Sequence, residues 1–153
     1  MGIRDYLTDP AQRRSINRAI RRAFDRRRGE CESVARILVV DNDPLTRQTL
    51  VRILERASFK VTAAANGNEA VEFYDRDGAD LVITDIFMPE CDGLETIAAL
   101  RRRSAETKII AVSSQPGPEG YLGAAASFGA THTLTKPFDT KQLLKAIKKL
   151  LGD

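Results

Sequence analysis

The sequence has few of the residues that build metal clusters and disulfide frameworks. Among its 153 residues there are one histidine and two cysteines, and a single histidine cannot supply a metal cluster. Cys31 and Cys91 lie far apart, at a spacing that fits no metal site, so we expect two ordinary free thiols in a reducing compartment. His132 falls in a short strand-like run, where we expect a structural role.

Long apolar runs are also absent. No run approaches the roughly 18 residues that a membrane-spanning helix requires, and the N-terminus lacks the apolar centre of a signal peptide. A hydrophobic content of 42% and a charged content of 29% are ordinary for a soluble globular protein. The length is that of about one domain, and we expect the protein in the cytoplasm.

The formal net charge of +3 is unevenly distributed along the chain. Residues 1–35 hold nine arginines and five acids, a balance of +4, whereas the other 118 residues hold 15 basic and 16 acidic residues, a balance of −1. This difference predicts two parts. Residues 1–33 are expected to form a basic amphipathic helix with a short linker, and residues 34–153 a globular domain.

The predicted N-terminal helix begins at Asp9, a good N-cap, with Pro10 at the first helical position, and it ends at Gly29. Apolar residues recur along it at three- and four-residue spacing, namely Ile16, Ala19, Ile20, Ala23 and Phe24. Its apolar stripe could pack on the rest of the chain or on a second copy. Its arginines could instead meet nucleic acid phosphates or an anionic membrane, or the segment could be a partner-docking or disordered arm. No helix-turn-helix pattern or aromatic interleaving favours nucleic acid.

From residue 36 onward, strand-like and helix-like segments alternate. Strands are expected over residues 36–41, 59–63, 81–85, 108–113 and 131–135, and helices over 44–57, after 66–67, and over 93–103, 121–128 and 140–151. This alternation predicts a doubly wound α/β fold with a five-stranded parallel sheet. The run Arg101–Arg103 is expected to be a solvated helix end. Only Gly152 and Asp153 follow the last helix, so we expect no C-terminal output domain.

Two predicted strands end in acids and a third ends before a lysine. Ile37–Val40 is followed by Asp41, the apolar run beginning at Leu81 ends in Asp85, and the last strand leads into Lys136. Because the carboxyl ends of parallel strands share one edge of a sheet, we expect one acidic pocket containing one lysine. Close carboxylates repel each other unless a cation lies between them, and their hard oxygen atoms suit Mg²⁺.

These residues and their neighbours resemble the response-regulator receiver domain over roughly residues 34–151. The resemblance is carried by Val40–Asp41, Asp85 with Met88–Pro89 and Asp92–Gly93, Ser113 after Ile110–Val112, and Lys136–Pro137–Phe138. It implies a flavodoxin-like sheet with the strand order 2-1-3-4-5. It also implies that Asp85 accepts a phosphoryl group from a histidine kinase or phosphotransfer protein, and that the chain signals through phosphorylation-dependent contacts with a target protein.

The resemblance also implies roles for the residues around Asp85. Mg²⁺ would be held by Asp41, by Asp85 and by the backbone carbonyl of Phe87. Lys136 and Ser113 would bind the phosphoryl group.

The resemblance further implies that the peptide bond between Lys136 and Pro137 is cis, which an X-Pro bond tolerates at a cost of about 0.5–1 kcal/mol.

We expect the chain to be a phosphoacceptor that assists its own phosphorylation and dephosphorylation, rather than an enzyme. A homodimer is possible.

Two positions depart from the family pattern. Asn42 stands where the family usually has a second acid that ligates the metal directly, so we expect weaker Mg²⁺ binding unless Asp43 compensates. Asn42 and Asp43 are therefore doubtful ligands, and Asp43 has an alternative role as the N-cap of the helix that begins at Pro44. Thr133 stands where the family often has a switch aromatic, so switching is expected to depend more on Ser113 and on residues 114–120.

Two other functions stay open. The loss of an acid at Asn42 could leave a degenerate receiver that acts as a constitutive protein-interaction module. Asp41–Leu45 also resembles the haloacid-dehalogenase phosphatase signature, with Asp41 as nucleophile and Asp43 as acid, although Leu45 breaks that pattern.

Overall fold

The computed structural model describes residues 34–86, 93–113 and 121–152. From Ala35 onward these residues belong to the second of the chain's two compact units, Ala35–Asp153. The predicted N-terminal helix, Phe87 and both cysteines lie outside the described residues.

A parallel sheet forms the centre of this unit. Its strands are β1 (Arg36–Val40), β2 (Lys60–Ala64), β3 (Leu81–Asp85), β4 (Lys108–Ser113) and β5 (His132–Thr135). They lie in the order β2-β1-β3-β4-β5, and every neighbouring pair is parallel. The predicted doubly wound sheet and its strand order are confirmed.

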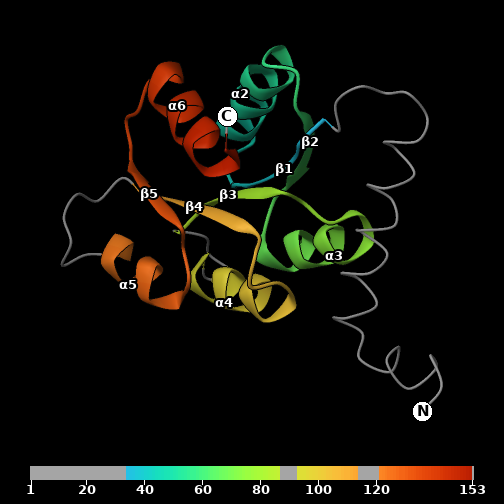
Figure 1. Ribbon diagram of the computed structural model, residues 1–153, viewed down its shortest axis with the longest axis vertical. Helices are drawn as coiled ribbons and strands as arrows, with labels where there is room; N and C mark the ends of the chain where they lie inside the picture. Colours follow the sequence, from blue (N-terminus) through green and yellow to red (C-terminus); the bar gives the residue numbers. More distant parts are fainter. Residues whose placement is uncertain (1–33, 87–92, 114–120, 153) are drawn as a thin grey trace. The chain divides into compact units, whose positions relative to one another are not determined.

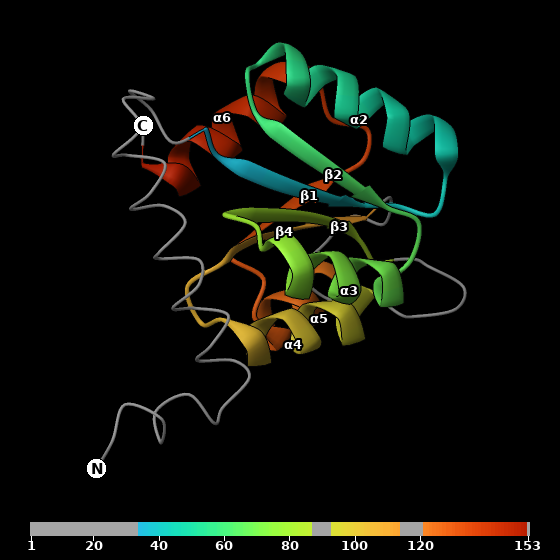
Figure 2. The ribbon, with the colours of Figure 1, turned by 90° about the vertical axis from the view of Figure 1, so that its right-hand side faces the viewer.

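Helices cover both faces of the sheet. Those in the described residues are α2 (Pro44–Arg56), α3 (Gly67–Asp77), α4 (Gly93–Arg103), α5 (Tyr121–Phe128) and α6 (Thr140–Leu151). Helices α2 and α6 lie on one face, and α3, α4 and α5 lie on the other (Figures 1 and 2). The central strands β1, β3 and β4 therefore each have an apolar layer above and below them.

This covering explains why β1 is apolar along most of its length. Leu38 and Val40 belong to the core on the side of α3, α4 and α5, whereas Ile37 and Val39 belong to the core beneath α2 and α6. All four side chains are at most 2% exposed. A strand buried on both faces needs a continuous apolar run rather than an alternating one.

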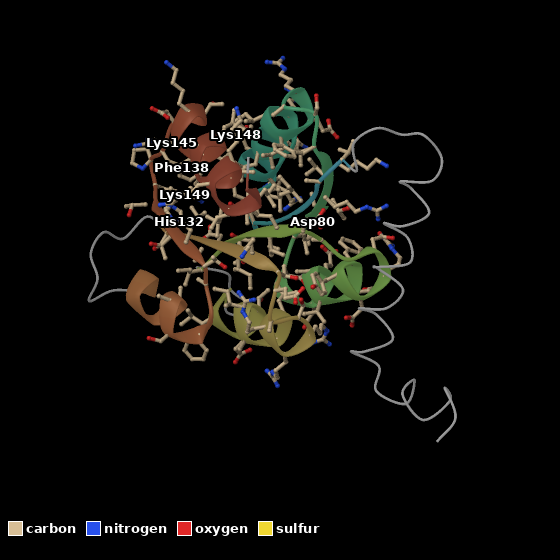
Figure 3. The ribbon with its side chains drawn as sticks, in the orientation of Figure 1. Asp80, His132, Phe138, Lys145, Lys148 and Lys149 are labelled. Carbon is tan, nitrogen blue, oxygen red and sulfur yellow. The ribbon has the colours of Figure 1, made fainter. Side chains whose placement is uncertain are left out.

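Helix α6 shows how the helices are placed on the sheet. Asp139 and Gln142 form a reciprocal capping box, in which the Gln142 N–H donates to the Asp139 carboxylate at 2.7 Å. The face packed on the sheet carries Leu143, Ala146 and Ile147. The exposed face carries Lys145, Lys148 and Lys149 (Figure 3).

The predicted boundaries of three strands differ from the structure by one residue. β1 ends at Val40, one residue before the predicted end. β2 begins at Lys60 because the Phe59 N–H still donates to Leu54 at the end of α2, at 3.1 Å. β5 begins at His132, one residue after the predicted start. Within the described residues, no helix is long and apolar enough to cross a membrane.

The expectation of a solvated helix end at Arg101–Arg103 is wrong for two of its three residues. Arg103 forms an ion pair with Asp75 of α3 at 2.7 Å. The Arg101 guanidinium donates to main-chain carbonyls in two segments beyond α4, at Ala105 (2.9 Å), Thr107 (2.8 Å) and Gly129 (2.6 Å). Arg102 is the exposed residue of the three. Arg101 therefore ties the end of α4 to the start of β4 and to the turn before β5.

Replacement of Arg101 by alanine should lower the free energy of unfolding by about 2 kcal/mol, because several partly buried carbonyl groups lose a charged donor. The matched control is Arg102→Ala, which changes the next residue, an exposed one, at the same helix end and should shift stability by no more than about 0.5 kcal/mol. Urea denaturation of both variants measures the difference. Equal losses in the two variants would contradict the structural role of Arg101.

Candidate functional site

The ends of three strands meet at one edge of the sheet. β1 and β3 are paired in register up to Val40 and Thr84, so the residues that follow, Asp41 and Asp85, lie side by side at the strand ends. Lys136 directly follows β5 at the same edge. The fold therefore brings together the two acids and the lysine that the sequence predicted for one pocket.

Lys136 lies between the two carboxylates. Its Nζ is 3.3 Å from Asp41 Oδ2 and 3.2 Å from Asp85 Oδ2. The side chain of Asp41 is 3% exposed, that of Asp85 is 13% exposed and that of Lys136 is 28% exposed. The pocket is therefore closed around Asp41 and opens toward Asp85 and Lys136.

The protonation of Lys136 depends on these contacts. Burial alone would lower the pKa of Lys136, but the charges of Asp85 and Asp41 and the hydrogen bonds to both outweigh burial and raise this pKa. Lys136 is therefore a fixed positive charge at neutral pH.

The three groups also favour a cation. Two carboxylates and one ammonium carry one net negative charge, and carboxylate oxygens are hard ligands of the kind that Mg²⁺ takes. Among the described residues, no group of three or more His, Cys, Asp and Glu side chains gathers as a metal cluster. The residues present therefore fit a divalent ion that draws its further ligands from main-chain oxygen or water, as Mg²⁺ commonly does.

Ser113 ends strand β4 at the same edge and is fully buried. Its main-chain carbonyl accepts a hydrogen bond from the N–H of Lys136 at 2.7 Å. The peptide bond between Lys136 and Pro137 is cis. Phe138 packs against the apolar core beneath α2 and α6, on the α6 side of the unit (Figure 3).

Asp43 lies in the turn between β1 and α2. The Asp43 side chain caps α2, accepting from the Thr46 N–H at 3.3 Å and from the Thr46 hydroxyl at 2.5 Å. The Thr46 hydroxyl is the main reason why the pKa of Asp43 is lowered. The predicted N-cap is confirmed, and in this structure the Asp43 carboxylate is used within the helix terminus.

The sequence analysis did not identify one residue of the site, Arg47, and gave no structural reason for another, Gly93. Arg47 of α2 donates from Nη1 to the main-chain carbonyl of Asp41 at 2.7 Å, and nothing in the sequence pattern marks it. Gly93 was recognised as part of a motif, but the requirement for glycine at this position is steric. A Cβ atom at Gly93 would lie 2.4 Å from the carbonyl oxygen of Asp85 and 2.5 Å from Cα of Ile86, so α4 can begin this close to Asp85 only with glycine.

The other predicted site residues are placed as follows. Asn42 is exposed, directly after Asp41. Thr133 lies in β5, opposite Ala111 of β4, and is half-buried. Phe87 lies outside the described residues.

Comparisons with known proteins agree with this fold and site. The response regulator receiver domain family matches residues 37–148. The chemotaxis protein CheY of Bacillus subtilis is 38% identical over 118 residues, which cover 76% of this chain and 98% of that protein.

Solved structures give the same answer. The chemotaxis response regulator CheY4 of Vibrio cholerae superposes with a TM-score of 0.73 at 31% identity, covering 77% of this chain and 99% of that one. The response regulator TrrA of Thermotoga maritima, solved in complex with Mg²⁺ and BeF, has a TM-score of 0.69 at 33% identity, covering 76% of this chain and 99% of that one.

The family match spans most of the chain, and the curated relative is matched along almost its whole length. The chain therefore belongs to the response regulator receiver domain family, as a CheY-like phosphoaspartate receiver of two-component signalling whose partner is a histidine kinase.

Proposed function

We propose that Asp85 is the phosphoacceptor and that the phosphoryl group comes from a phosphohistidine of the kinase or of a phosphotransfer protein. One observation carries this proposal, namely the Lys136 ammonium held between the carboxylates of Asp85 and Asp41. It combines a nucleophile that is partly open to a partner with a fixed positive charge beside it. The chain is thus a phosphoacceptor and not a conventional enzyme.

In the proposed step, a carboxylate oxygen of Asp85 attacks the phosphorus atom of the phosphohistidine. A P–O bond forms, the P–N bond breaks, and the electron pair of that bond stays on the imidazole nitrogen of the donor. Lys136 stabilises the negative charge of the transferred group, and the Ser113 hydroxyl donates a hydrogen bond to it. Positioning and charge stabilisation are the main contributions that a protein makes to phosphoryl transfer.

The same residues fit a bound Mg²⁺, by analogy with the TrrA complex. When bound, the ion would supply positive charge against the phosphoryl oxygens. Asp41 and Asp85 would hold it together with the main-chain carbonyl of Phe87. Asn42 could add an amide oxygen, whereas Asp43 would first have to leave its helix cap.

A groove beside the pocket supports a partner protein as the donor. It has a volume of about 510 Å³, and Lys136 lines it together with apolar residues of α2, of the segment between β5 and α6 and of the start of α6, among them Leu45, Leu50 and Phe138. Leu45 is 72% exposed. A donor protein that covers this apolar surface would reach Asp85 from the open side of the pocket.

Signalling follows from the position of Lys136 between β5 and α6. When Lys136 and Ser113 turn toward a phosphoryl group on Asp85, the contacts at the end of β5 change, and the outer surface of α5, β5 and α6 is the proposed site for a target protein or a second copy. Thr133 offers no ring for this switch. We place the protein in the cytoplasm, and we keep residues 1–33 as a separate basic segment before a receiver domain of residues 34–153.

Incubation with acetyl phosphate and Mg²⁺ should add one phosphoryl group to the wild-type chain, as measured by intact mass. Asp85→Asn should abolish the adduct, because it removes the nucleophile and keeps the size of the side chain. Asp41→Asn keeps Asp85 and should slow the reaction without moving the adduct elsewhere. An adduct that only Asp41→Asn removes would favour the phosphatase interpretation, and no adduct at any Mg²⁺ concentration would leave a degenerate receiver.

Replacement of Asn42 by aspartate should tighten Mg²⁺ binding by about tenfold, because it adds a carboxylate beside two others and raises the net negative charge of the pocket. Isothermal titration calorimetry measures the affinity. The control is Gln48→Glu, which adds the same charge at an exposed position of α2 and should change the affinity far less. Equal effects of the two changes would mean that position 42 does not face the ion.

A further inference from the structure

Besides the hydrogen bond of its N–H to Ala64, Asp41 is held at three further atoms by three different residues. The N–H of Asp43 donates to Asp41 Oδ1 at 2.9 Å, and Lys136 Nζ lies 3.3 Å from Oδ2. Arg47 Nη1 donates to the main-chain carbonyl of Asp41 at 2.7 Å. We propose that Arg47 is a positioning residue of the phosphoacceptor site, which fixes the turn between β1 and α2 so that the Asp41 carboxylate faces the pocket. This inference rests on the function proposed above.

The carbonyl of Asp41 needs a donor because the strand ladder ends before it. The last residue of β1 is Val40, and beyond it the N–H of Asp41 still donates to Ala64 at 3.1 Å. Among the described residues, the guanidinium of Arg47 is the donor recorded for the carbonyl of Asp41. A partly buried carbonyl without a partner would be costly, so Arg47 stabilises the conformation in which the chain leaves the sheet.

The charged guanidinium of Arg47 donates its hydrogen bond to a neutral carbonyl and not to a carboxylate. No ion pair joins Arg47 to an acidic side chain in the part of the chain that the structure describes. Among the described residues, the Asp41 carboxylate therefore has the Asp43 N–H and Lys136 as its partners. A charged donor also makes a stronger hydrogen bond than a neutral one, which suits a residue that has to hold a turn.

The turn between β1 and α2 is short, and its other hydrogen bonds depend on the same backbone conformation. Asn42 and Asp43 alone separate Asp41 from α2, and the Arg47 N–H donates to the Asp43 carbonyl at 3.0 Å in the first turn of that helix. Arg47 therefore ties the first turn of α2 back to the strand end and holds the Asp43 N–H against Asp41 Oδ1. Because Asn42 replaces the second acid in this chain, Asp41 is the one carboxylate that this turn directs to the pocket, and its orientation matters more.

The positioning role and simple electrostatics predict opposite results for removal of the Arg47 charge. Loss of a cation near the pocket, taken alone, should tighten the binding of Mg²⁺ because it removes a repulsion. Loss of the hydrogen bond that orients Asp41 should weaken the binding of Mg²⁺. Residues that orient a metal ligand typically contribute at least about tenfold to metal affinity. The sign of the change therefore separates the two effects.

The test compares Arg47→Met, Arg47→Lys and the control Arg52→Met in the full-length chain. Methionine keeps the length and helix propensity of arginine without a donor, and Arg52 is an exposed residue of the same helix. Calorimetry should show Mg²⁺ affinity about tenfold weaker in Arg47→Met, partly restored in Arg47→Lys and unchanged or slightly tighter in Arg52→Met.

A second readout uses the metal-free protein. In NMR spectra, the amide proton of Asp43 should lose its hydrogen-bonded shift in Arg47→Met and keep it in Arg52→Met, while urea denaturation shows that the variant remains folded at the measuring temperature. Mg²⁺ affinity equal to or tighter than wild type in Arg47→Met, or an unchanged Asp43 amide, would overturn the proposal. If the wild type takes up phosphate on Asp85 while Arg47→Met binds Mg²⁺ normally, only this inference fails, whereas an unphosphorylated wild type would refute the proposed function itself.

Discussion

The contact on which the site depends is the bridge from Lys136 to Asp41 and Asp85. Two carboxylates at neighbouring strand ends repel each other, and the ammonium between them offsets most of that repulsion in a partly buried setting. The sheet order makes the bridge possible, because β3 lies next to β1 while β5 brings the lysine to the same edge. The apolar cores on both faces then keep these strand ends from moving apart. The fold can thus be understood as a scaffold that holds one positive and two negative charges in register.

Much of this could be predicted from the sequence, for a geometric reason. Parallel strands direct their carboxyl ends to one edge, so an acid after each of two apolar runs and a lysine after a third must lie near one another once the strand order is known. Asp41, Asp85 and Lys136 therefore appear in the structure where the sequence placed them. The helix cap of Asp43 was predictable as well, since an acid before a proline is a local signal that needs no tertiary information. The competing metal role could not be decided from the sequence, because it depended on whether the side chain turns toward Thr46 or toward the pocket.

What the sequence did not reveal are contacts of charged side chains with main-chain carbonyls. Arg101 and Arg103 stand in a run of three arginines, and a run of like charges at a helix end normally indicates solvent. In the structure, Arg101 binds carbonyls from segments before β4 and before β5, and Arg47 binds the carbonyl at the end of β1. A carbonyl acceptor is present at every residue, so it leaves no mark in the sequence. Gly93 is a related case. Glycine is required there because the Asp85 carbonyl lies too close for a Cβ atom, and not because of a turn conformation.

The replacement of an acid by Asn42 changes the balance of charge in the pocket more than its shape. Asp41 and Asp85 exceed Lys136 by one negative charge, whereas a third carboxylate at position 42 would make the excess two. A smaller negative excess attracts a divalent cation less strongly. With less of that cation bound, Lys136 would supply a larger share of the positive charge beside a phosphoryl group. If Asp41 and Asp85 hold a Mg²⁺ as proposed, the geometry of these two ligands would contribute more of the affinity, since charge would contribute less. If the turn after β1 positions Asp41 as proposed, its orientation by Arg47 and by the cap of α2 would take over part of the role that the charge of a third carboxylate would have.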